Sequence, residues 1–104
     1  MKKIYNKLVR DNIPFICEKN GQLVKIKNLD DKQYTEALHE KLKEEVQEYM
    51  LDYNIEELAD IIEVVEAIAE NKGSNLEKIL EIKRIKRNKN GAFKKRIFLI
   101  SVEN

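Results

Sequence analysis

Two apolar stripes with helical spacing occupy the middle of the chain and limit what it can fold into. Apolar and aromatic side chains of the first stripe recur every three to four residues: Tyr34, Leu38, Leu42, Val46 and Tyr49. After a short break, the second stripe consists of Leu58, Ile61, Ile62, Val65, Ile68 and Ala69. Such spacing places apolar side chains on one face of an α-helix. The sequence therefore predicts a mainly α fold, an antiparallel helical bundle with short loops.

Residues with short polar side chains mark where the two long helices should begin. Asp30 or Asp31 is expected to cap a helix that runs to about Asp52. Asn54 is expected to cap the next helix, and Glu57, three residues on, is a capping-box partner for it. The connection between the helices is then only a few residues long.

The second long helix is expected to end at Gly73, because glycine readily adopts the left-handed conformation that terminates helices. Ser74 and Glu77 have the spacing of another capping box, which predicts a third long helix through about Asn88.

The remaining segments predict minor elements. A short helix is expected over residues 12–18, with Pro14 in its first turn. Alternating or β-prone residues predict short strands at 22–28 and 97–102, paired with each other. The expected fold is thus a helical bundle with a minor short β element.

Four carboxylates in the two long helices form two pairs with i,i+3 spacing, Glu45 with Glu48 and Glu57 with Asp60. On a helix this spacing brings Cβ atoms to about 5–6 Å of each other. Glu57 and Asp60 share their arc of the helix with apolar residues, where a charge is costly without a partner. Hard divalent cations prefer oxygen ligands. The two pairs therefore predict a cation site between the helices.

The strongest alternative gives the same acids a structural role. In that interpretation Glu57 belongs to the capping box, and Asp60 pairs with a lysine from the third long helix. The spacing of the acids is compatible with either interpretation.

Charge is unevenly distributed along the chain. The formal net charge is +1, which does not predict a polyanionic partner such as nucleic acid. Residues 36–70 are mostly acidic, whereas 83–96 are strongly basic. Cations beside carboxylates suit a phosphate ester carried with a metal ion. The basic residues expected to bind phosphate are Lys83, Lys86 and Arg87, followed by Lys95 and Arg96.

Length and composition bound the remaining possibilities. The 104 residues predict a single domain spanning 1–104. Charged residues make up 38 %, which is high for a compact monomer and favours a homodimer or higher homo-oligomer. Cys17 is the only cysteine, so neither a disulfide framework nor a thiolate metal site is expected. No apolar run suits a signal peptide or a membrane span, and the expected location is the cytoplasm.

Three blocks of the sequence resemble one family. The runs EEVQE and EELAD are similar to the EExxE…ExxD signature of the MazG-like nucleoside triphosphate pyrophosphohydrolases, part of the all-α NTP pyrophosphatase group. The opening YNKLVRDNIP resembles the KLVRDxIP start of short members labelled phosphoribosyl-ATP pyrophosphohydrolase-like. The tail KRIKRNKNGAFKKRIFL is similar to their basic helix, Gly-x-Phe turn and closing apolar segment. The resemblance covers nearly the whole chain.

The chain departs from the family pattern in two places. The spacing from Glu48 to Glu57 is shorter than in longer MazG proteins, which requires a tight turn between the helices. The tail has Asn90-Gly91-Ala92-Phe93 where many relatives carry Arg-Gly-Gly-Phe, so the arginine's contribution is missing there.

The resemblance implies Mg²⁺-dependent hydrolysis of a nucleoside triphosphate between its α and β phosphates, giving a monophosphate and pyrophosphate. Mn²⁺ is the expected substitute for Mg²⁺. Carried over to this sequence, the metal ligands would be Glu45, Glu48, Glu57 and Asp60. Glu44 would orient or deprotonate the attacking water.

The sequence does not decide the role of the opening YNKLVRDNIP block. Lys7, Arg10 and Asp11 either reach the substrate or fix the N-terminal segment through an Arg10–Asp11 ion pair. Two other functions also remain. One is hydrolysis of phosphoribosyl-ATP in histidine biosynthesis. The other is a non-catalytic helical module that binds nucleic acid through the basic C-terminal region.

Overall fold

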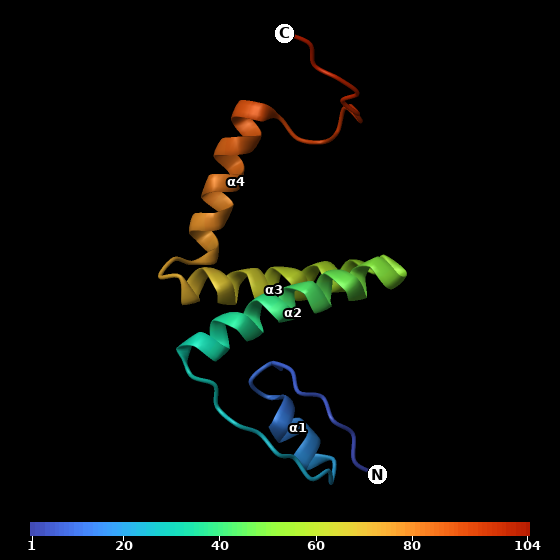
Figure 1. Cartoon of the computed structure of the whole chain (residues 1–104), viewed down its shortest axis with the longest axis vertical. Coiled ribbons are helices and arrows are strands. Elements are labelled where there is room, and N and C mark those ends of the chain that lie inside the picture. The colour runs from blue at the N-terminus through green and yellow to red at the C-terminus, as the bar shows by residue number, and fades with distance from the viewer.

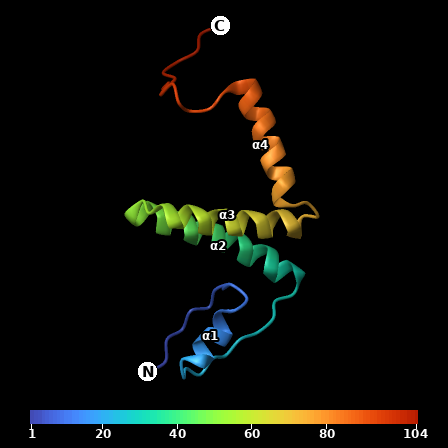
Figure 2. The ribbon, with the colours of Figure 1, turned by 180° about the vertical axis from the view of Figure 1, so that it is seen from behind.

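Two long helices, α2 (Asp31–Asp52) and α3 (Ile55–Asn71), lie side by side as an antiparallel hairpin at the centre of the structure (Figure 1). The structure, a computed structural model, describes all 104 residues. The short helix α1 (Ile13–Lys19) lies on one side of the hairpin, and α4 (Leu76–Asn90) rises from its other side (Figures 1 and 2). The predicted mainly α fold is confirmed.

The start of α2 is fixed by a complete capping box. The Asp30 carboxylate accepts a hydrogen bond from the backbone N–H of Gln33 at 2.8 Å. In return, Gln33 Oε1 accepts from the backbone N–H of Asp30 at 3.2 Å. These two bonds satisfy donors that a helix N-terminus otherwise leaves unpaired.

A two-residue turn, Tyr53-Asn54, joins α2 to α3, as the short spacing predicts. Tyr53 is left-handed, with φ of 56°, and its N–H donates to the Tyr49 carbonyl at 2.7 Å. Its ring packs edge-on against that of Tyr49, with the centroids 5.7 Å apart. The aromatic contact accompanies a backbone conformation that non-glycine residues adopt at a cost.

The cap of α3 differs in detail from the prediction. Asn54 Oδ1 accepts from the backbone N–H of Glu56 at 2.9 Å. The backbone N–H of Asn54, which Glu57 would have to bind in a capping box, instead donates to Asp52 Oδ1 at 3.1 Å. The Glu57 side chain is therefore not part of a cap, and that half of the structural alternative is wrong.

The core of the hairpin is small. Leu38 of α2 and Val64 and Ala69 of α3 are the three buried residues of the chain. Leu58 and Ile62, expected in the main core face of α3, are 40 % and 53 % exposed. The rest of that predicted face is buried at Ala69 and half-buried at Ile61, Val65 and Ile68. Val64, on the arc that carries the acidic pair, is buried as well.

Residues 73–75 redirect the chain between α3 and α4. Gly73 adopts φ of +81° just beyond the end of α3, as predicted. The cap of α4 is Asn75, whose Oδ1 accepts from the Lys78 N–H at 2.8 Å, so the predicted Ser74–Glu77 capping box is wrong. Asparagine is at least as good a cap as serine, and here it stands one residue later.

The predicted β element is absent. The chain contains four helices and no strand. The segments 22–28 and 97–102 lie toward opposite ends of the structure (Figures 1 and 2), so neither has a neighbour to complete its backbone hydrogen bonds. Beyond α4, residues 91–104 extend away from the helices (Figure 1). None of the helices combines the length and apolar character needed to cross a membrane.

Candidate metal centre

Three carboxylates from the two central helices converge on one point. Glu45 of α2 and Glu57 and Asp60 of α3 each offer an oxygen, and these oxygens lie within 4.8 Å of one another. All three residues are half-buried. Neighbouring oxygens around an octahedral Mg²⁺ are about 3 Å apart, so the three side chains would have to close in by roughly 1–2 Å. Oxygen ligands of this kind suit Mg²⁺ or Mn²⁺.

Glu57 is the unsatisfied member of this carboxylate triad. It makes no hydrogen bond or ion pair through its side chain. Its pKa is raised, first by partial removal from water and then by the negative charges of Asp60, Asp52, Glu48 and Glu45. A carboxylate whose charge is disfavoured by other carboxylates gains most from a cation placed among them.

The other two members of the triad already have basic partners. Asp60 Oδ1 accepts from Arg10 Nη2 at 2.8 Å, and Arg10 Nη1 lies 3.9 Å from Glu63. Glu45 lies 3.3 Å from Lys41 Nζ. The partner of Asp60 thus comes from the N-terminal segment, whereas the structural alternative expected a lysine of α4. The Arg10–Asp11 ion pair, one of the two alternatives for the opening block, is not formed.

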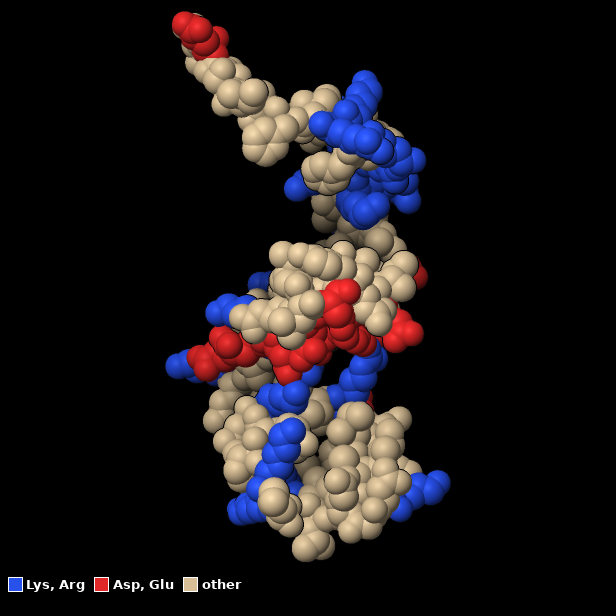
Figure 3. Space-filling view, turned by 90° about the vertical axis from the view of Figure 1, so that its right-hand side faces the viewer, with Lys and Arg blue, Asp and Glu red and all other residues tan.

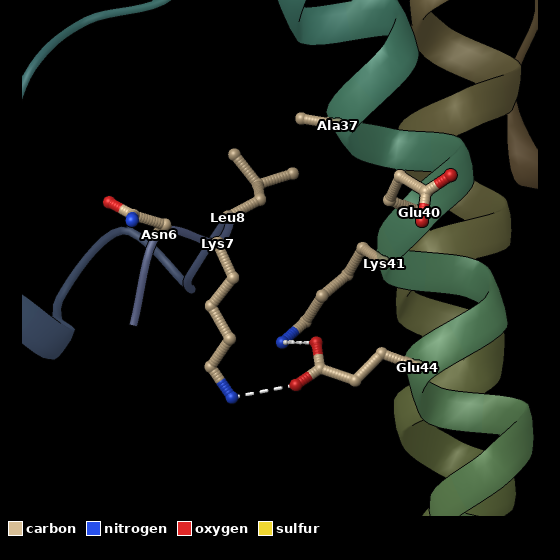
Figure 4. A pocket seen from close by; sticks show the side chains of 7 residues that line it. All are labelled: Asn6, Lys7, Leu8, Ala37, Glu40, Lys41 and Glu44. Carbon is tan, nitrogen blue, oxygen red and sulfur yellow. Dashed lines mark hydrogen bonds and ion pairs between the residues drawn. The ribbon is translucent and has the colours of Figure 1, made fainter. Parts of the chain in front are cut away.

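Glu44 stands beside the triad and faces the N-terminal segment (Figure 4). Its oxygens accept from Lys7 Nζ at 2.6 Å and Lys41 Nζ at 3.0 Å. The hydrogen bond from Lys7 is the main cause of a lowered Glu44 pKa, and the same bond raises the pKa of Lys7. A carboxylate with both oxygens paired is a weak proton acceptor, so the predicted role of Glu44 requires one lysine to move.

A hollow of about 390 Å³ adjoins this pair of lysines. Its lining comes from the N-terminal segment on one side and from α2 on the other (Figure 4): Asn6, Lys7, Leu8, Ala37, Glu40, Lys41 and Glu44. The hollow is open and charged, which is compatible with a polar ligand.

The structure brings together some of the predicted site residues and separates others. Glu48 is exposed and outside the triad, and its ligand role stays a prediction. Lys7 and Arg10 are at the acidic cluster. The α4 and tail cations gather apart from the acidic band of the hairpin (Figure 3): Lys83, Lys86, Arg87, Lys95 and Arg96. No residue of α4 comes near α2.

Sequence reasoning missed two residues of this site. Lys41 is 16 % exposed and bridges Glu44 and Glu45, and Glu63 offers Arg10 a second carboxylate. The i,i+4 spacing of Lys41 and Glu45 could have predicted their ion pair. For Glu63 no local pattern existed, because its partner lies far away in the sequence.

No protein-family model matches the chain, and comparisons with curated proteins and with solved structures gave no match.

Proposed function

We propose that the chain is a cytoplasmic, Mg²⁺-dependent nucleotide pyrophosphohydrolase of the MazG-like kind. It would hydrolyse a nucleoside triphosphate between the α and β phosphates, releasing a monophosphate and pyrophosphate. The observation that carries the proposal is the convergence of Glu45, Glu57 and Asp60, from two different helices, on one point. All three lie in the EEVQE and EELAD runs on which the family resemblance rests.

In this proposal the residues of the site have two roles, cation binding and phosphate binding. Glu45, Glu57 and Asp60 would hold the cation. When bound, Mg²⁺ would supply charge neutralisation at the phosphates and lower the pKa of a coordinated water. Arg10 and Lys7 supply nearby positive charge, and the guanidinium can bind phosphate in bidentate fashion.

Assembly into a homo-oligomer is part of the proposal. A compact monomer of this mass exposes about 6,100 Å², whereas this chain exposes 10113 Å². Its radius of gyration is 18.4 Å, against roughly 13 Å for a compact domain of this length. The exposed apolar side chains include Leu58, Ile62 and Ile85. Burial of such surface against copies of the chain is the main stabilising term available to it.

The position of the basic residues of α4 also favours assembly of several copies of the chain. Asp60 lies about 16 Å along the α3 axis from the end of that helix, and α4 then leads away from the hairpin (Figure 1). If Lys86 or Arg87 contacts the phosphates, it does so at the triad of another copy.

A nucleic-acid-binding module is the second candidate, favoured by one observation. Basic side chains crowd the surface around α4 (Figure 3). Phe93, which directly precedes Lys94 and Lys95 in the sequence, is 98 % exposed. Exposed cations and an aromatic ring are the elements with which proteins hold single strands.

One experiment separates the two candidates. Pyrophosphate release is measured over a panel of nucleoside triphosphates and phosphoribosyl-ATP, with Mg²⁺ and with chelator. Magnesium-dependent release that is lost in Asp60→Asn but kept in Glu63→Gln supports the hydrolase. No release with any substrate, together with salt-sensitive binding of RNA or DNA that is indifferent to Asp60→Asn, supports the module instead.

A further inference from the structure

The first twelve residues, termed here the N-terminal arm, are attached to the hairpin mainly through charge. Two long-range side-chain hydrogen bonds join the arm to the hairpin, Lys7 to Glu44 at 2.6 Å and Arg10 to Asp60 at 2.8 Å. The helix that follows, α1, does not pack against α2, α3 or α4. Lys7 and Arg10 therefore hold the arm to the hairpin, Arg10 at the triad carboxylate Asp60 and Lys7 at Glu44 beside the triad.

The two attachment points differ in their relation to the triad. Asp60 belongs to the triad, whereas Glu44 does not. A divalent cation bound by the triad would compete with Arg10 for the Asp60 carboxylate and repel the guanidinium. It would leave the Lys7–Glu44 bond in place. The arm can therefore release one contact and remain tethered by the other.

Arg10 is well placed for such an exchange of partners. Its side chain is 56 % exposed, so it can reorient without disturbing a packed core. Glu63, 3.9 Å from Nη1, is a carboxylate outside the triad that can keep the guanidinium nearby. A phosphate oxygen is a stronger partner for a guanidinium than an exposed carboxylate at that distance.

We propose that Arg10 has two alternative partners: the Asp60 carboxylate when the triad is empty of cation, and a phosphate group of the substrate when a divalent cation occupies the triad. The arm then acts as a latch, closed by the Arg10–Asp60 bond and tethered by the Lys7–Glu44 bond. This inference rests on the proposed function, since it requires a cation at the triad. It deepens that function by assigning Arg10 to the phosphate chain.

The test measures the binding of Mn²⁺ alone and then of inorganic pyrophosphate in the presence of saturating Mn²⁺. Removing an exposed competing ion pair should tighten Mn²⁺ binding about two- to fivefold in Arg10→Gln. The same variant should bind pyrophosphate several-fold more weakly. Arg10→Lys keeps the charge and should bind Mn²⁺ like the unsubstituted chain. Lys2→Gln, which removes a charge from the arm where no carboxylate is paired, should change neither affinity.

The outcomes separate the latch from the proposed function. Failure of the unsubstituted chain to bind Mn²⁺ would overturn both. Normal Mn²⁺ binding with unchanged or weaker affinity in Arg10→Gln, at unchanged helix content by circular dichroism, would overturn the latch alone. Mg²⁺ without nucleotide should also speed tryptic cleavage after Arg10 relative to cleavage after Lys2. An unchanged ratio of the two rates would contradict release of Arg10 from Asp60.

Discussion

Replacing Asp60 by asparagine is the sharpest probe of the carboxylate triad, because it removes one negative charge and keeps the shape of the side chain. A carboxylate about 3.5 Å from a divalent ion contributes about 2 kcal/mol in a water-like dielectric, which is a conservative choice for half-buried groups. That corresponds to roughly thirtyfold in affinity. The substitution also deprives Arg10 of its 2.8 Å partner, and the loss of that competitor offsets up to about 1 kcal/mol. Mn²⁺ affinity should therefore fall about five- to thirtyfold.

Glu63→Gln is the matched control for this measurement. Glu63 lies one helical turn further along α3 and also faces Arg10, at 3.9 Å, but it stands outside the triad. Its replacement should change Mn²⁺ affinity by less than about twofold. Isothermal titration calorimetry of both variants gives the two affinities. Unchanged Mn²⁺ affinity in Asp60→Asn, or an equal loss in Glu63→Gln, would refute the assignment of the triad as a metal site.

Two further predictions concern the caps and the arm. Asn75→Ala should destabilise the chain by about 1 kcal/mol through loss of the α4 cap, whereas Ser74→Ala should be nearly neutral; urea denaturation followed by circular dichroism measures both, and equal effects would contradict the cap assignment. The Lys7–Glu44 pair should stabilise the docked arm between the ordinary pKa values of 4.5 and 10.5. The lowered pKa of Glu44 means that the stabilisation is lost as the pH falls through that pKa, and the raised pKa of Lys7 means that it is lost at the alkaline end. An NMR titration of Glu44 should therefore show a midpoint below 4.5, which moves upward in Lys7→Met; a midpoint that does not respond to the substitution would refute the pairing.

The long helices were predictable because their signals are local. Apolar periodicity defined α2 and α3, and Asp30, Asn54 and Gly73 marked their boundaries, since caps act through bonds to residues a few positions away. The strands at 22–28 and 97–102 were mispredicted for the opposite reason. Their alternating pattern is local, but a strand requires a neighbouring strand, and the fold places these segments far apart.

The buried face of α3 was predicted only in part: Ala69 is buried, whereas Leu58 and Ile62 are exposed. Both of its arcs are apolar, and periodicity alone does not tell which one meets α2. The structure buries Val64, on the arc shared with Glu57 and Asp60, and exposes Ile62. The acidic pair, which looked misplaced within an apolar arc, is therefore at the edge of the helix–helix contact.

The site was predictable to the extent that it depends on two helices adjacent in sequence. The grouping of Glu45 with Glu57 and Asp60 follows from the helical repeat and a tight turn. The pairing of Arg10 with Asp60 could not be predicted in this way, because no pattern in the intervening residues indicates where the arm lies.

The two-residue connection at Tyr53-Asn54 fixes the helical register between Glu45 and the other two members of the carboxylate triad. A single amino acid inserted into α3 just after its cap would rotate the rest of that helix by about 100°, carrying Asp60 from the inner edge to the outside of the hairpin. A change of length between Glu45 and Asp60 must therefore be accommodated in the turn, outside both helices, where it need not rotate Asp60 away from Glu45.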